Sequence, residues 1–86
     1  KEIIRANFSL RFLKPKRALK KLKMPVLMMG GRHDRLVKPS TTTALSKMIP
    51  NVELEIFEDS GHSPYFEIPT QYNERVMRFL DKHWPV

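Results

Sequence analysis

Two short apolar runs, each followed by a loop and a polar side chain, constrain this chain more than any other feature. The first run is Val26–Met29 and the second is Val52–Phe57. Both have the length and composition of β-strands. Segments with apolar residues at helical spacing lie before, between and after them. Because strands that alternate with helices are typical of a parallel sheet with helical crossovers, we expect an α/β fold.

Prolines mark the expected starts of three helices, which cover about residues 15–22, 41–49 and 69–83. Ser40 is expected to be the N-cap of the second helix. The glycine pair Gly30-Gly31 directly after the first strand is expected to let the backbone turn sharply. The buried side of the second helix is expected to contain Ala44, Leu45, Met48 and Ile49.

One polar residue of catalytic type follows each strand, Asp34 after the first and His62 after the second. The carboxyl ends of parallel strands meet at one edge of a sheet, where ligands bind. We therefore expect the Asp34 carboxylate to lie within hydrogen-bond reach of a His62 ring nitrogen. Such a pair fits the acid and base of a catalytic triad, because the carboxylate orients the imidazole and the second ring nitrogen takes a proton. Taken singly, each residue is equally consistent with an ordinary loop position.

A metal site is the weaker interpretation of the same region. His33, Asp34, His62 and Glu67 are all residue types that bind metal ions. No pairing at helical spacing within this set supports such a site. The chain has no cysteine, which excludes a disulfide framework and a thiolate zinc site. We expect neither a metal ion nor a cofactor.

The net charge of +7 is concentrated at the start of the chain. Residues 1–24 contain nine Lys or Arg and one Glu, whereas residues 25–86 carry a net charge of −1. A basic segment can bind polyanions. The dense basic run has no interleaved aromatic residue to stack on bases, so we expect no nucleic-acid binding. No apolar run approaches the roughly 20 residues that span a membrane and no signal peptide is visible, so we expect a cytoplasmic protein without membrane contact.

Three motifs together resemble the α/β-hydrolase superfamily over about residues 15–84. They are the strand and loop Pro25-Val-Leu-Met-Met-Gly-Gly-Arg-His-Asp34, the later Ser60-Gly-His62, and Glu67-Ile-Pro69. In that family a G-x-x-D loop supplies the triad acid, which matches Asp34. A GH pair after the last strand supplies the triad histidine, which matches His62. Among the branches, the region after His62 is similar to proline iminopeptidases and related esterases.

The resemblance implies that the chain is part of a larger hydrolase. Residues 15–86 would form the C-terminal strand–helix–strand–helix part of the parallel sheet, and residues 1–14 the end of a helical lid. The family places its nucleophile in an earlier G-x-S-x-G elbow, a pattern that this sequence lacks. The chain begins with Lys1, which is consistent with a processed product or a fragment.

The function implied by the resemblance is a serine-type hydrolase that acts on ester, amide or related bonds of a small molecule or short peptide. The partner required is the missing N-terminal part, in the same or another chain, that carries the nucleophile. No substrate-binding residue is identified, and the 86-residue chain is expected to be inactive alone. The alternative is a basic, non-catalytic interaction module that binds an acidic partner through residues 1–24.

Overall fold

The computed structural model describes residues 15–85 of the chain. Helices and strands alternate in the predicted manner, which confirms the α/β class. The predicted lid segment, residues 1–14, lies outside the described residues. The elements in chain order are α1 (Pro15–Lys20), β1 (Val26–Gly31), α2 (Pro39–Ser46), β2 (Val52–Phe57), α3 (Pro64–Glu67) and α4 (Pro69–His83).

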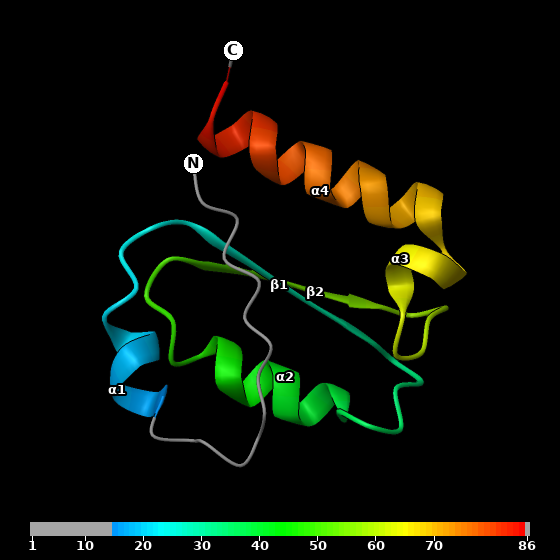
Figure 1. Cartoon of the computed structure of the whole chain (residues 1–86), viewed down its shortest axis with the longest axis horizontal. Helices are drawn as coiled ribbons and strands as arrows, with labels where there is room; N and C mark the ends of the chain where they lie inside the picture. Colours follow the sequence, from blue (N-terminus) through cyan, green and yellow to red (C-terminus); the bar gives the residue numbers. More distant parts are fainter. Residues whose placement is uncertain (1–14, 86) are drawn as a thin grey trace.

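The two strands form a parallel pair, as the sequence predicted. The register runs from Val26 opposite Val52 to Gly31 opposite Phe57. Figure 1 shows α2 on one side of this pair and α4 on the other, so the elements lie in three layers. Because the strands are parallel and end level with each other, the loops that follow them leave the same edge of the sheet.

The side chains of β2 alternate between two different environments, because successive residues of a strand face opposite sides of the sheet. Ile56 lies near Thr42 of α2 and the backbone of Gly30. Glu53 and Glu55 instead bond to side chains of α4. The α2 side of β2 is therefore apolar, and the α4 side is largely ionic.

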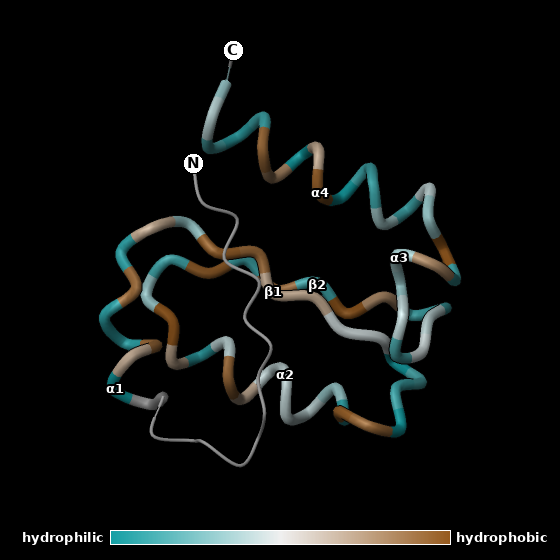
Figure 2. The backbone as a smooth tube through the Cα atoms, viewed as in Figure 1, coloured by the Kyte–Doolittle hydropathy of each residue, from teal (hydrophilic) through white to brown (hydrophobic). Residues whose placement is uncertain are grey.

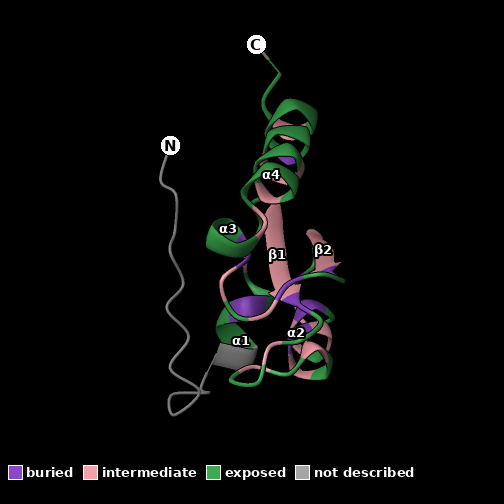
Figure 3. Ribbon diagram, turned by 90° about the vertical axis from the view of Figure 1, so that its right-hand side faces the viewer, coloured by how far each residue is buried: buried purple, intermediate pink, exposed green. Residues whose placement is uncertain are grey.

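The core of the described chain is small. Its buried hydrophobic residues are Leu19, Ile49, Phe57 and Phe79. Most residues of both strands are only half-buried, as Figure 3 shows in pink. Only one edge of β1 is paired among the described residues. In Figure 2 the apolar colouring follows the strands and returns in short stretches along α4.

The helix α2 differs from the prediction at both ends. Lys38 is its N-cap, with Pro39 in the first turn and no side-chain cap, so Ser40 lies inside the helix. The helix ends at Ser46, and its buried residues are Thr42 and Ser46 rather than Ala44, which is exposed. The reason is the close approach of α2 to Gly30, where a Cβ would lie only 3.2 Å from the Thr42 hydroxyl. Small polar residues fit this narrow interface.

The predicted turn at Gly30-Gly31 is wrong, because β1 continues through Gly31. No glycine among the described residues has a positive φ angle. These glycines are needed for close packing rather than for an unusual backbone conformation.

None of the helices in residues 15–85 combines the length and the apolar character that crossing a membrane requires.

Candidate active site

Asp34 and His62 meet at the carboxyl edge of the sheet. The Asp34 Oδ2 atom lies 3.0 Å from the His62 Nδ1 atom. This distance confirms the predicted geometry, in which two loops leaving parallel strands bring the two side chains together. The Asp34 side chain is 7% exposed, whereas the His62 side chain is 56% exposed. The carboxylate is thus held inside the protein and the imidazole reaches outward.

The second oxygen of Asp34 is bound by the backbone of its own loop. Oδ1 accepts hydrogen bonds from the amides of Leu36 at 2.8 Å and Val37 at 2.9 Å. Burial by itself would raise the pKa of Asp34, but the hydrogen bonds from Val37, His62 and Leu36 outweigh it and the pKa lies below its usual value. Asp34 is therefore ionised at neutral pH, as an orienting carboxylate must be.

The ring of His62 is engaged on one side only. Within the described residues, no hydrogen bond involves its Nε2 atom, and the ring is largely open to solvent. When Nδ1 carries the proton that is shared with Asp34, Nε2 presents a lone pair. The pair can therefore accept a proton from a group placed outside the described residues.

The loops that carry Asp34 and His62 are joined by backbone hydrogen bonds. The amide of Arg32 donates to the carbonyl of Phe57, and the amide of His33 donates to the carbonyl of Ser60, both at 2.9 Å. The Arg32 guanidinium adds a 2.9 Å ion pair with Glu58 across the same two loops. The relative position of the loops is thus set largely by main-chain atoms.

Gly31 makes this close approach possible. A Cβ atom at residue 31 would overlap the carbonyl oxygens of Ser60 and Gly61, which are backbone atoms and cannot easily move aside. The sequence predicted a turn at Gly31 and did not indicate this role. The sequence signal for this contact was the presence of a glycine at the end of the first strand, Gly31, and another in the loop after the second strand, Gly61.

Glu67 is a second residue whose contribution the sequence did not indicate. Its two carboxylate oxygens accept hydrogen bonds from the amides of Gly61 at 2.9 Å and Ser63 at 2.8 Å. These two bonds, from Gly61 first and Ser63 second, lower the pKa of Glu67. The short helix α3 that presents Glu67 was not predicted. The sequence Ser63-Pro64, a polar residue and then proline, is a signal for a helix start.

His33, the remaining candidate, does not join this site through its side chain. His33 is exposed and contributes its backbone amide. The neighbouring aromatic pair on α3 is also exposed, Tyr65 by 63% and Phe66 by 81%. Among residues 15–85, no group of three or more His, Cys, Asp or Glu side chains lies close enough to hold a metal ion.

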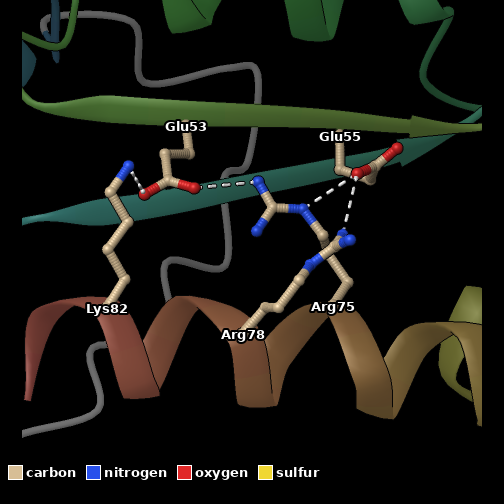
Figure 4. Close-up of a pocket in the computed structure, with 5 residues that line it drawn as sticks. All are labelled: Glu53, Glu55, Arg75, Arg78 and Lys82. Carbon is tan, nitrogen blue, oxygen red and sulfur yellow. Dashed lines mark hydrogen bonds and ion pairs between the residues drawn. The ribbon is translucent and has the colours of Figure 1, made fainter. Parts of the chain in front are cut away.

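A separate hollow lies between β2 and α4, away from Asp34 and His62. It is lined by the side chains of Glu53, Glu55, Arg75, Arg78 and Lys82. Figure 4 shows the two carboxylates of β2 pointing toward the three basic side chains of α4. Arg75 bonds to Glu55 at 2.8 Å and to Glu53 at 3.0 Å. These charges are matched to one another, so the hollow is an ion-paired interface rather than a reactive centre.

Glu53 is the most heavily bonded carboxylate of that interface. Its Oε2 atom lies 2.7 Å from His83 Nε2 and 3.2 Å from Lys82 Nζ. The hydrogen bond with His83, then those with Arg75 and Lys82, overcome desolvation and lower the pKa of Glu53 to about 2. This carboxylate remains ionised through the whole physiological range.

Comparison with known proteins agrees with this geometry. The sequence profile of the alpha/beta hydrolase fold matches residues 5–69. The uncharacterized carboxylesterase nap of Bacillus subtilis is 36% identical over 64 residues, which are 73% of this chain and 21% of that protein. Proline iminopeptidase of Heyndrickxia coagulans is 36% identical over 63 residues, which are 73% of this chain and 22% of that protein.

A solved structure extends the likeness from sequence to fold. A thermophilic esterase from Thermogutta terrifontis superposes with a TM-score of 0.77 and 27% identity, covering 80% of this chain and 26% of the esterase. The chain spans only about a fifth of the length of the two curated relatives described above. The similarity therefore concerns one portion of much longer proteins.

Proposed function

Since the chain belongs to the alpha/beta-hydrolase superfamily and its relatives are esterase-like hydrolases, we propose that it supplies the acid and the histidine of a serine-type catalytic triad. The observation that carries this proposal is the 3.0 Å contact between a buried Asp34 and an exposed His62 at the ends of adjacent parallel strands. A buried, ionised carboxylate that leaves the far ring nitrogen open is what general-base catalysis requires.

In the proposed mechanism His62 acts twice. Its Nε2 atom first takes the proton of a serine hydroxyl, and the oxygen attacks the carbonyl carbon of the substrate. The same proton then passes to the leaving oxygen or nitrogen, and a water molecule repeats the sequence to release the acid. Asp34 keeps the ring in one tautomer and stabilises the imidazolium that forms in each step.

The nucleophile lies outside this sequence, which contains no G-x-S-x-G elbow. We propose that it resides in a preceding part of the same fold, in the same or another chain, together with the amides that stabilise the oxyanion. The proposed substrates are esters or amides of a small molecule or short peptide. The names carboxylesterase and proline iminopeptidase among the relatives support those two bond types.

The proposal is tested in the full-length protein that contains this chain. A fluorophosphonate probe, which reacts with an activated serine, measures the nucleophile directly, and p-nitrophenyl butyrate and L-proline p-nitroanilide distinguish ester from amide substrates. We expect Asp34→Asn to abolish probe labelling and hydrolysis, because the amide favours the wrong tautomer of His62. Asp81→Asn is the matched control, since Asp81 is exposed on α4.

Equal labelling of the wild type and Asp34→Asn would rule out the triad. Labelling without hydrolysis of either substrate would keep the triad and discard the proposed substrate class. The 86-residue chain alone is expected to show neither reaction.

A further inference from the structure

One side chain holds the main chain on both sides of His62. The Glu67 carboxylate accepts the amide hydrogen of Gly61, the residue before His62, at 2.9 Å. It also accepts that of Ser63, the residue after His62, at 2.8 Å. The two oxygens of one carboxylate thus bracket the single exposed imidazole of the candidate site. Glu67 is itself bound to this loop, because its own amide donates to the Ser63 carbonyl at 2.9 Å.

Helix capping explains only half of this arrangement. Ser63 is the N-cap of α3 but makes no side-chain cap hydrogen bond, and Glu67 satisfies its amide instead. Gly61 lies two residues before that cap and outside the helix, so the second bond satisfies no amide of the helix. The bond to Gly61 fixes the chain as it enters His62, which points to a role at the histidine.

His62 needs such support more than Asp34 does. The Asp34 carboxylate is buried and is held by two amides of its own loop. The His62 ring is 56% exposed and, within the described residues, is bonded only to Asp34. The preceding residue is glycine, whose backbone has the greatest conformational freedom. Without an external anchor, the loop can move the imidazole away from the line between Asp34 and a nucleophile.

We infer that Glu67 is a positioning residue of the catalytic site, and that it sets the place of the His62 ring by binding the amides of Gly61 and Ser63. This inference rests on the proposed function, because it concerns the same histidine. A carboxylate suits the task since it offers acceptors to two donors. A glutamine offers one acceptor and turns an NH₂ group toward the other amide, so it can keep only one of the two bonds.

The inference is tested with Glu67→Ala and Glu67→Gln in the full-length protein. Glu74→Ala and Glu74→Gln are matched controls, because Glu74 is an exposed glutamate of α4. We expect Glu67→Ala to lower kcat for p-nitrophenyl butyrate by about 10–100-fold while KM changes little, since a displacement of about 1 Å at a reacting group costs about this much. Glu67→Gln should fall between Glu67→Ala and the wild type.

Hydrogen exchange of the peptide covering residues 58–68 provides a readout that does not depend on activity. Loss of two hydrogen bonds to a carboxylate should make the amides of Gly61 and Ser63 exchange about tenfold faster or more in Glu67→Ala. The Glu74 variants should exchange at the wild-type rate.

Three results separate the possibilities. Unchanged exchange in Glu67→Ala would overturn the inference, because the clamp would not exist. Faster exchange with unchanged kcat would also overturn it, because the clamp would then hold a loop whose position does not affect turnover. Unchanged hydrolysis in Asp34→Asn would instead contradict the proposed function. The inference would then be rejected as well, because it rests on that function.

Discussion

Asp34 and Glu53 each bind a histidine, yet the two pairs are built in opposite ways. The Asp34–His62 contact is 3.0 Å and the Glu53–His83 contact is 2.7 Å, so distance does not distinguish them. Exposure does, since the His62 side chain is 56% exposed and that of His83 is 18% exposed. A carboxylate beside an imidazole becomes a candidate site only where the ring remains open to a substrate.

The two carboxylates also differ in what holds them. Asp34 is fixed by backbone amides of Leu36 and Val37, whereas Glu53 is fixed by the side chains of Arg75 and Lys82. Backbone donors are already ordered by the fold, while long basic side chains lose rotamer freedom when they bind. The protein thus uses its more rigid donors at the edge of the proposed catalytic site, and its more adaptable ones between β2 and α4.

The largest expected effect comes from replacing one histidine of each pair. In the full-length protein, His62→Ala should lower kcat/KM for p-nitrophenyl butyrate by about 10⁴-fold or more, because the proposed general base is lost. His83→Ala should leave kcat/KM unchanged and reduce stability instead. Steady-state kinetics and thermal unfolding of both variants check the contrast. Equal losses of activity would show that the exposure of the ring is not the deciding property.

The second prediction concerns the main chain near Asp34. Gly31→Ala should destabilise the protein by about 1–3 kcal/mol and reduce turnover, because the new methyl group meets the backbone carbonyls of Ser60 and Gly61. Gly30→Ala is the control. Its methyl group meets the side chains of Thr42 and Ile56, which have more freedom to adjust. The free energy of unfolding in urea and kcat should both fall more for Gly31→Ala than for Gly30→Ala. The reverse order would contradict the role of Gly31 in the close approach of the two loops.

The third prediction concerns the ionic side of the sheet. Arg75 is 11% exposed and bonds to both carboxylates of β2, whereas Arg78 is 72% exposed and lies 3.9 Å from one of them. Arg75→Ala should cost about 1–3 kcal/mol, between the values for exposed and buried ion pairs. Arg78→Ala should cost no more than about 0.5 kcal/mol. Denaturant unfolding of both variants measures the difference, and similar costs would mean that burial does not strengthen this interface.

The last prediction concerns the dependence of stability on pH. The pKa of Glu53 is lowered from 4.5 to about 2, so its contribution to stability is present above 4.5 and is lost as the pH falls toward 2. Glu53→Gln should therefore be less stable than the wild type at pH 7, and the two should converge near pH 2. Unfolding midpoints at several pH values, followed by Trp84 fluorescence, measure this convergence. A constant difference across the range would exclude a role for Glu53 ionisation.

The sequence predicted the strands, their parallel pairing and the Asp34–His62 contact, because these features depend on apolar runs and on the order of elements along the chain. The apolar runs defined both strands, and the order of elements defined their parallel pairing. The positions of Asp34 and His62 after those strands then predicted their contact, which the structure confirms. Their catalytic role stays a prediction.

The details that the sequence did not reveal depend on close approach in three dimensions. Gly31 serves the packing of two loops that are distant in sequence, and Thr42 is buried because Gly30 opposite has no side chain. Glu67 acts through backbone amides, which have no signature in the sequence around them. The basic segment prompted an alternative function, which the family relationship does not favour.

The unequal faces of β2 have a consequence for behaviour on heating. Hydration of charged groups becomes less favourable as temperature rises, so the cost of removing water from the ion pairs between β2 and α4 falls. The gain from burying apolar surface on the α2 side levels off over the same range. As the temperature rises, the ion pairs between β2 and α4 should therefore retain more of their contribution to stability than the apolar contacts on the α2 side.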